Sequence, residues 1–192
     1  MTALPLERPR LLTVAEFAAL PEATDGRYEL QEGRVVMSPS PMPEHQLCLQ
    51  ELQYQLRDQL PGHLRTVPEV DVDLGLVPAE RPGFVRIPDL VVVTRSGLQR
   101  RRHEGGLLRA DEVVLAVEIL SDGSRRTDRT IKHDEYADAG IPHYWILDID
   151  DRPALTACHR AGEFGYADAP AVTGVFTTDA PFPVRLDLDR LA

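Results

Sequence analysis

Two short apolar runs constrain the fold of this chain more than any other feature. IPDLVVV and VVLAVEIL carry apolar residues at both odd and even positions, which is typical of strands buried on both faces. Each run nevertheless contains one acid, Asp89 in the first and Glu118 in the second. The chain therefore needs a covered sheet that tolerates two carboxylates.

These two acids cannot simply be buried as ions. Moving an ionised carboxylate into an apolar interior costs several kcal/mol, roughly, even after relaxation, whereas a whole domain is stable by only about 5–15 kcal/mol. Each acid must be protonated, paired with a cation, placed at a wet strand end, or bound to a metal. For either acid alone, a salt bridge to a nearby arginine is the simplest explanation.

Periodicity and end signals predict the other elements. One helical face is defined by His45, Leu49, Leu52, Leu56 and Leu60, which recur every three or four residues. In chain order we expect a short helix capped by Thr13 and Glu16, a hairpin over 28–37 with its turn near Glu32 and Gly33, a helix from Pro43 to Pro61, strands over 69–74, 85–93 and 111–120, a helix over 127–139, a strand over 143–150 and a late hairpin over 155–169. This order indicates the α/β class, with helices packed on a mixed sheet.

Composition limits the class of protein further. The chain has 192 residues, of which 43% are apolar and 27% charged, enough for one domain over residues 1–192. No run approaches the ~20 apolar residues that span a bilayer, and the N-terminal MTALPLERPRLLT lacks the layout of a secretory signal. Cys48 and Cys158 form no CxxC pair, and they indicate neither a disulfide framework nor a cysteine zinc site. We expect a cytoplasmic protein with no membrane partner.

The charge of the chain is uneven. The formal net charge of −10 argues against a protein that coats nucleic acid by neutralising phosphates, but the distribution of charge matters more than the total. Basic residues gather in RSGLQRRRH (95–103) and SRRTDRTIK (124–132), shortly after each odd acid. Arg125, Arg126 and Arg129 are candidate DNA contacts, and a solvated loop is the simpler alternative for each cluster.

The two acids together favour metal chemistry. If their strands are neighbours, both carboxylates reach one crevice, and two hard oxygen donors suit Mg²⁺. Such an ion lowers the pKa of a bound water and neutralises charge on a phosphate under attack. Lys132, which shares a helical face with Arg129 and Tyr136, is the candidate for stabilising the transition state or positioning the water.

Several motifs of the chain together resemble a known family. They are Pro88-Asp89, VEIL (117–120), the spacing S-x-x-S-x-x-x-D-x-x-x-K from Ser121 to Lys132, EYADAGIPHYWILD (135–148) and the opening RYELQEGRVVMSPSPMPEH (27–45). From about residue 12 to 148 the chain resembles the Uma family of predicted restriction endonucleases, in the PD-(D/E)XK nuclease superfamily.

This resemblance implies a restriction-endonuclease-like core, with a central mixed sheet flanked by helices and hairpins at both ends, that cleaves DNA with Mg²⁺ or Mn²⁺. Asp89 and Glu118 would be the metal ligands, helped by the carbonyl of Ile119. The superfamily's usual lysine would stand where the chain has Leu120, and the resemblance implies that Lys132 supplies it from the next helix. A homodimer or higher homo-oligomer would suit symmetric cutting of duplex DNA.

Glu29 and His45 are further catalytic candidates. Glu29 lies in the opening strand and would line the same crevice, with an ordinary pairing to Arg27 or Arg34 as the alternative. His45 points inward at the start of its helix, where a core or capping histidine is the alternative. Asp128 is expected to charge the first helical turn rather than to bind metal.

The sequence leaves more than one function open. The first is a Mg²⁺-dependent DNA endonuclease, and the second is a catalytically silent member of the same fold that binds DNA or assembles with itself. A third is a protein in which both acids form structural salt bridges. The other histidines show no zinc-ligand spacing, and the chain contains neither G-x-x-x-x-G-K-[ST] nor G-x-S-x-G.

Overall fold

The computed structural model describes residues 10–21, 26–38, 41–121, 123–162 and 165–191. In this part of the chain the strands form three sheets. The central sheet has the order β11-β10-β9-β8-β6-β3, with β12 paired to β10. Its strands are β3 (Leu64–Pro68), β6 (Leu90–Thr94), β8 (Val113–Ile119), β9 (His143–Asp148), β10 (Ala154–Arg160), β11 (Tyr166–Asp168) and β12 (Val172–Thr173). The β8–β9 pair is parallel and the others are antiparallel, so the predicted mixed sheet is confirmed.

A second, smaller sheet has the order β2-β1-β5-β4-β7. It consists of β1 (Arg27–Gln31), β2 (Arg34–Ser38), β4 (Val72–Asp73), β5 (Val85–Arg86) and β7 (Leu108–Arg109). The predicted hairpin is β1–β2, and its turn places Glu32 and Gly33 at φ 50° and 76°. Gly33 is required there, since a Cβ atom would lie 2.6 Å from the Cβ of Pro82. The third sheet is the hairpin of β13 (Val175–Thr178) and β14 (Val184–Asp187).

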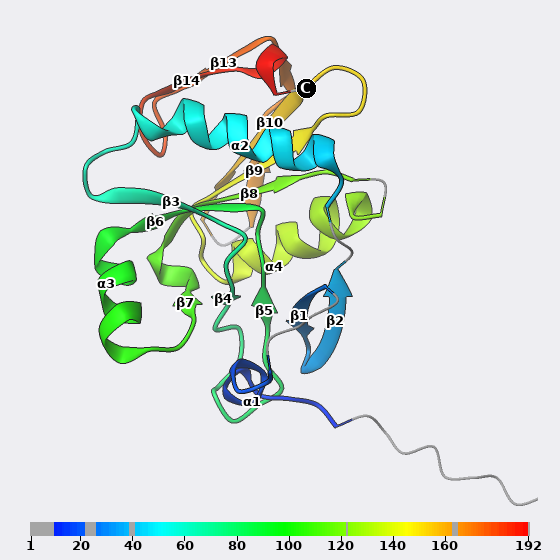
Figure 1. Ribbon diagram of the computed structural model, residues 1–192, viewed down its shortest axis with the longest axis vertical. Coiled ribbons are helices and arrows are strands. Elements are labelled where there is room, and N and C mark those ends of the chain that lie inside the picture. Colours follow the sequence, from blue (N-terminus) through cyan, green and yellow to red (C-terminus); the bar gives the residue numbers. More distant parts are fainter. Residues whose placement is uncertain (1–9, 22–25, 39–40, 122, 163–164, 192) are drawn as a thin grey trace, which may run out of the picture.

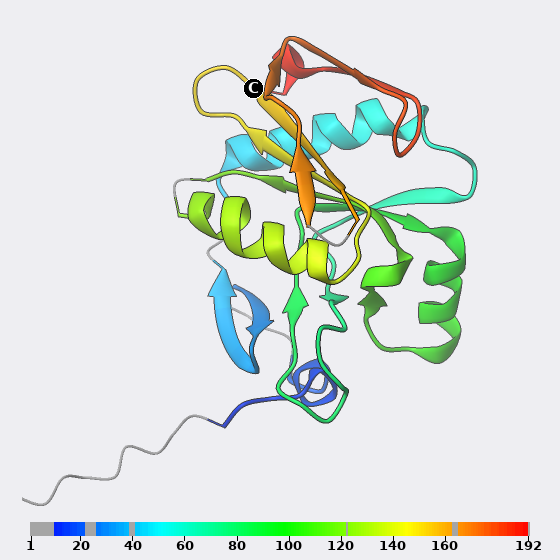
Figure 2. The same cartoon turned by 180° about the vertical axis from the view of Figure 1, so that it is seen from behind.

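Helices cover both faces of the central sheet. Figure 1 shows α2 and the β13–β14 hairpin on one side of it and α4 on the other, and Figure 2 gives the reverse view. The helical segments are α1 (Val14–Ala18), α2 (Pro43–Arg57), α3 (Arg95–Glu104), α4 (His133–Asp138), the 3₁₀ turns η1 (Ala110–Glu112) and η3 (Leu188–Arg190), and the π-helical turn η2 (Thr127–Lys132). The predicted capping box of Thr13 and Glu16 is present on α1.

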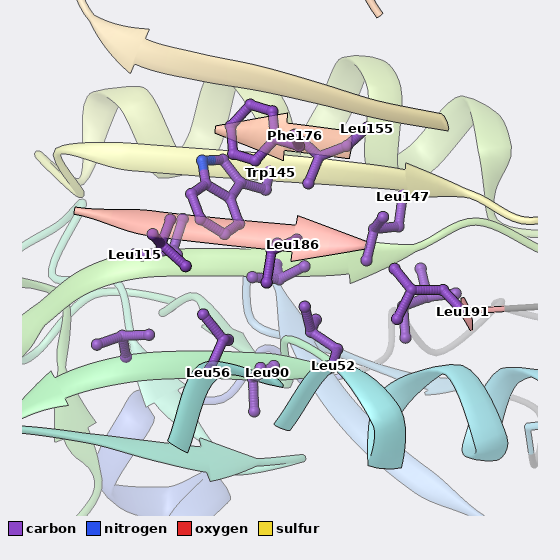
Figure 3. Close-up of a cluster of buried hydrophobic side chains, with 14 of the residues drawn as sticks. Leu52, Leu56, Leu90, Leu115, Trp145, Leu147, Leu155, Phe176, Leu186 and Leu191 are labelled. Atoms are coloured by element: carbon purple, nitrogen blue, oxygen red, sulfur yellow. The ribbon is translucent and has the colours of Figure 1, made fainter. Parts of the chain in front are cut away.

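The larger apolar cluster lies under α2 and the C-terminal hairpin. Leucines of α2 face alternate residues of the central strands, and the ring of Trp145 packs edge-on against Phe176 with centroids 5.3 Å apart. Figure 3 shows this layer. Leu90, Val117 and Trp145 all belong to this cluster. The residues that alternate with them along β6, β8 and β9 therefore face the opposite side of the sheet.

The opposite face packs against α4. Its buried residues include Val91, Ala116, Tyr136 and Tyr144. Val91 lies two residues from Asp89, and Ala116 lies two residues from Glu118. Since side chains alternate along a strand, the two odd acids both belong to the α4 face.

The observed elements differ from the expected ones in four places. The half-exposed strand expected over 69–74 is present only as the short β4, because Glu69 has a φ of 50°, which breaks the extended backbone before it. The strand expected over 85–93 is divided into β5 and β6, which belong to different sheets. The helix α3 is not predicted by the sequence patterns. The helix expected over 127–139 exists, but its first turn is π-helical.

None of the helices in the described residues combines the length and the hydropathy that crossing a bilayer requires.

Candidate active site

The strands β6 and β8 bring the two acids to one place. Leu90 pairs with Val117 in an antiparallel register, so one further step places Asp89 opposite Glu118. The backbone N–H of Ile119 donates to Oδ2 of Asp89 at 2.7 Å. The expected arrangement of the two acids on adjacent strands, facing one side, is therefore present.

Asp89 pairs with no arginine in the part of the chain that the structure describes. Its Oδ2 lies 3.1 Å from Nε2 of His45, which the first turn of α2 points into the sheet. Nδ1 of His45 is buried and has no hydrogen-bond partner among the described residues. The histidine therefore fixes one carboxylate oxygen of Asp89, together with the N–H of Ile119.

Lys132 is the cation beside Glu118. Its Nζ lies 2.8 Å from Oε1 of Glu118, 3.4 Å from Oε1 of Glu29 and 3.3 Å from Oδ1 of Asp128. The hydroxyl of Tyr136 donates to the same Oε1 of Glu118 at 2.7 Å. Asp128 and Lys132 are the buried residues of the π-helical segment η2, and both side chains point into the site. Such π-helical segments are frequent at functional sites.

Glu29 is positioned by a second cation. Nη1 of Arg86 lies 2.9 Å from its Oε2, and the N–H of Ile87 donates to its Oε1 at 3.0 Å. The same guanidinium binds both oxygens of Glu135, at 2.6 and 2.8 Å. Arg86 therefore ties β1, β5 and α4 together at the base of the site.

Burial and charge shift the pKa values of these groups in opposite directions. Burial raises the pKa of Glu118 well above its usual value, Lys132 offsets this only in part, and repulsion from Asp89 adds to it. Burial alone would lower the pKa of Lys132, but the three carboxylates outweigh it and raise that pKa. For Glu29 burial is opposed by Lys132 and Arg86, and its pKa is lowered. Lys132 is therefore charged at neutral pH.

These groups open onto a pocket of about 540 Å³. Asp89, Glu118, Glu29, His45 and Lys132 all line it. The rim is formed on one side by the β1–β2 hairpin and the start of α2, and on the other by the segment after β8. Its residues include Arg27, Gln31, Val36, Met37, Met42, Ser121, Ser124 and Thr127.

The charge balance of the site fits a divalent cation. Five carboxylates of the site are buried or nearly buried: Lys132 pairs with those of Glu29, Glu118 and Asp128, Arg86 pairs with those of Glu29 and Glu135, and His45 pairs with that of Asp89. A surplus of oxygen donors over cations, facing a solvent-connected pocket, is what Mg²⁺ or Mn²⁺ binds. Asp89 and Glu118 lie at the pocket wall, where they would hold such an ion.

Three sequence expectations about the site need revision. Asp128 lies in the first turn of η2, as expected, but it is 1% exposed and pairs with Lys132, so it belongs to the charged groups of the site. Arg129 does not share the inward face of Lys132 and Tyr136, because it is exposed and pairs with Asp148. Glu29 pairs with Arg86 and Lys132 rather than with Arg27 or Arg34, since its side chain points inward.

The candidate DNA-contacting arginines lie beside the pocket rather than in it. Arg125 pairs with Asp148 and Asp150, Arg129 pairs with Asp148, and Arg126 is exposed. The pocket itself is lined by Arg27 and Arg86 instead.

Some residues of the site have little signal in the sequence. Arg86 stands one residue before Ile87-Pro88-Asp89, in a stretch that reads as a strand, and its role appears only when β5 meets β1 and α4. Tyr136 and Glu135 follow the segment that carries Lys132, and the i+4 spacing of Tyr136 from Lys132 is a weak indication that both face one site.

Comparisons with known proteins agree with this fold. A family model described as "Uma2: Putative restriction endonuclease" matches residues 14–188. Among solved structures, a "putative nuclease belonging to DUF820" from Anabaena variabilis ATCC 29413 matches with a TM-score of 0.69 and 21% sequence identity, over 94% of this chain and 97% of that one. No curated protein sequence matches the chain. At this identity the structural match supports the fold alone.

Proposed function

This chain belongs to the Uma2 family, described as "Putative restriction endonuclease", and from this premise we propose that it is a DNA endonuclease that uses Mg²⁺ or Mn²⁺ to hydrolyse phosphodiester bonds. The observation that carries the proposal is the surplus of carboxylates around Lys132, in a pocket that solvent reaches. Burial and repulsion from the neighbouring carboxylates raise the pKa of Glu118, and a divalent cation at the pocket wall would stabilise its ionised form.

In this proposal Asp89 and Glu118 hold the cation, with the neighbouring carbonyl of Ile119 as a further oxygen donor. When bound, such an ion supplies positive charge at the attacked phosphate and makes a water more acidic. His45 and the N–H of Ile119 keep one oxygen of Asp89 in place, so that its other oxygen can face the pocket.

Lys132 is the proposed catalytic cation. Its raised pKa keeps it charged, and it lies at the pocket wall beside Glu118. It would stabilise negative charge that develops on the phosphate in the transition state. Glu29, Asp128 and Tyr136 position the ammonium and carboxylate groups rather than react.

Plasmid nicking tests this proposal. Wild type with Mg²⁺ or Mn²⁺ is expected to cleave supercoiled DNA, and Asp89→Ala, Glu118→Ala and Lys132→Ala are each expected to lower the rate by on the order of 100-fold or more. Asp58→Ala is the matched control, because this acid at the C-cap of α2 is 86% exposed and does not line the pocket. Chelation of divalent ions should abolish cleavage by wild type.

Two outcomes would reject the proposal. Equal cleavage by all variants would mean that the nicking came from a contaminating nuclease. Absence of cleavage by wild type on supercoiled, linear and single-stranded DNA, with either ion, would favour a catalytically silent DNA-binding or self-assembling protein. Two observations favour that second function. Leu120 is buried in the core at the position of the superfamily's lysine. The ammonium of Lys132 already forms an ion pair with Glu118.

A further inference from the structure

A second cluster of potential metal ligands lies apart from the pocket. A ring nitrogen of His133, Sγ of Cys158 and a carboxylate oxygen of Asp168 lie within 4.8 Å of one another. The three residues come from different elements: His133 begins α4, Cys158 lies in β10 and Asp168 in β11. Cys158 and Asp168 are direct partners in the β10–β11 register, so the sheet itself places two of the three groups side by side.

The imidazole of His133 is held in one orientation. Its Nε2 lies 2.9 Å from Oδ1 of Asp168, and its Nδ1 lies 3.2 Å from Oδ1 of Asp134. The ring packs edge-on against Tyr166 and Tyr144, with centroids 5.2 and 6.2 Å away. Metal-binding histidines typically donate their second ring N–H to a carboxylate, and Asp134 is placed for that role.

We propose that His133, Cys158 and Asp168 form a zinc site that ties α4 to the edge of the central sheet. An imidazole, a thiolate and a carboxylate are the three ligand types that Zn²⁺ takes in proteins. Mg²⁺, which prefers oxygen donors, suits the pocket instead. Asp168 is 51% exposed on its side chain and Cys158 is buried, so the ion would enter from the Asp168 side, where a water completes the shell.

The distances allow such a site after small side-chain movements. Ligand atoms around a tetrahedral Zn²⁺ lie about 3.3–3.6 Å apart, as follows from bond lengths of about 2.0–2.3 Å. The His133–Asp168 pair, at 2.9 Å, would open slightly, and Cys158 would move toward it.

The alternative is an ordinary ion pair. A protonated His133 would bridge Asp168 and Asp134, and Cys158 would remain a thiol, because burial raises the pKa of Cys158. A bound zinc ion would instead take the thiolate. The state of the Cys158 sulfur therefore separates the two possibilities.

Cobalt titration of the full-length, metal-stripped protein reads this state directly. Co²⁺ substitutes for Zn²⁺ and, when a thiolate binds it, gives a charge-transfer band in the near ultraviolet. We expect one equivalent of Co²⁺ to produce this band, and Zn²⁺ to remove it by displacement. Cys158→Ser and Asp168→Asn should each lose this band, and Asp134→Asn should weaken the cobalt affinity read from the band by about 10–100-fold.

Two variants serve as controls. Cys48→Ser removes the other free cysteine, which is equally buried, and should keep the band. Asp89→Asn removes a proposed ligand of the pocket and should also keep it, so that failure of this site and failure of the nuclease proposal can be told apart. Since Asp168 is exposed, loss of binding in Asp168→Asn does not depend on a core variant that folds poorly.

The proposal also predicts a rise in melting temperature with Zn²⁺ in wild type and in Cys48→Ser, and none in Cys158→Ser or Asp168→Asn. It is overturned if wild type shows no thiolate band and no zinc-dependent rise in melting temperature, or if the band survives in Cys158→Ser.

Discussion

Lys132 lies where removal of one charge affects several others. Three carboxylates lie within 3.4 Å of its Nζ, and the side chain is only 8% exposed. Buried charges of this kind are mutually dependent, since loss of one partner leaves the rest uncompensated in a medium of low polarity. The lysine therefore has a part in folding as well as the proposed part in catalysis.

Replacing Lys132 by methionine should lower the free energy of unfolding by about 3–5 kcal/mol at neutral pH, because three carboxylates lose their cation. Adding Glu118→Gln should recover part of this loss, since one of the orphaned charges is removed. Urea denaturation of both single variants and the double variant measures the coupling. Strictly additive losses would contradict a direct Lys132–Glu118 interaction.

For single residues, the sequence predicts a role in the site best where the residue differs in polarity from its neighbours. Asp89 and Glu118 stand out because each interrupts an apolar run. Lys132 follows from its helical spacing and from the family resemblance. Arg86 and Glu135 do not stand out, because charged residues are ordinary in short strands and helices. Cys158 and Asp168 come together only through the β10–β11 register, which no local pattern specifies.

The helix α3 packs closely on its neighbours although its sequence is mostly basic. Thr94 caps it by accepting from the N–H of Gly97, at 3.1 Å. A Cβ atom on Gly97 would lie 2.7 Å from the Cβ of Glu112. Glu112 in turn binds Arg100 through Nη2 at 2.9 Å. Gly97 therefore lets α3 approach the start of β8.

Gly97→Ala is expected to destabilise the protein by about 1–3 kcal/mol, because overpacking against Glu112 outweighs the gain in helix propensity of about 1 kcal/mol. Gly62→Ala is the matched control, since a Cβ there meets nothing within 4 Å, and it should leave stability nearly unchanged. Thermal denaturation of both variants compares them. A Gly97→Ala variant more stable than wild type would show that α3 does not pack this tightly.

Elements with end signals are predicted better than elements without them. The capping box of α1, the Glu32-Gly33 turn and Pro43 at the start of α2 each mark a boundary that the structure keeps. The helix α3 lacks an apolar periodicity, because it is rich in arginine and its buried residue is Gly97. Over 69–74 the alternation of acids and apolar residues predicts a strand, but the left-handed backbone conformation at Glu69 leaves only Val72–Asp73 extended, as β4.

For the whole molecule, the C-terminal hairpin is part of the main core. Phe176 of β13 packs on Trp145 of β9, and Val184 and Leu186 of β14 belong to the same cluster as the leucines of α2 (Figure 3). The opposite faces of β6 and β8 carry the pocket acids. Core and pocket therefore share the same two strands.

Phe176→Ala should lower the free energy of unfolding by about 3–5 kcal/mol, since it leaves a cavity beside Trp145. Trp145 fluorescence and far-ultraviolet circular dichroism should report one common transition, because the hairpin does not unfold apart from the sheet. The neighbouring Val175→Ala, whose side chain is 45% exposed, should change stability little. Two separate transitions in wild type would show that the hairpin is an independent unit.

The position of Lys132 on a helical segment, rather than on the strand of Glu118, affects how related chains can be recognised. Lys132 stands fourteen positions beyond Glu118 and pairs with its carboxylate, while Leu120, two positions after Glu118, is buried in the apolar core. A sequence pattern that requires a lysine two positions after the second acid would miss this chain and any other chain with the same arrangement. The feature to look for is an ammonium group beside the buried acid. A comparison of structures would detect it where a sequence pattern does not.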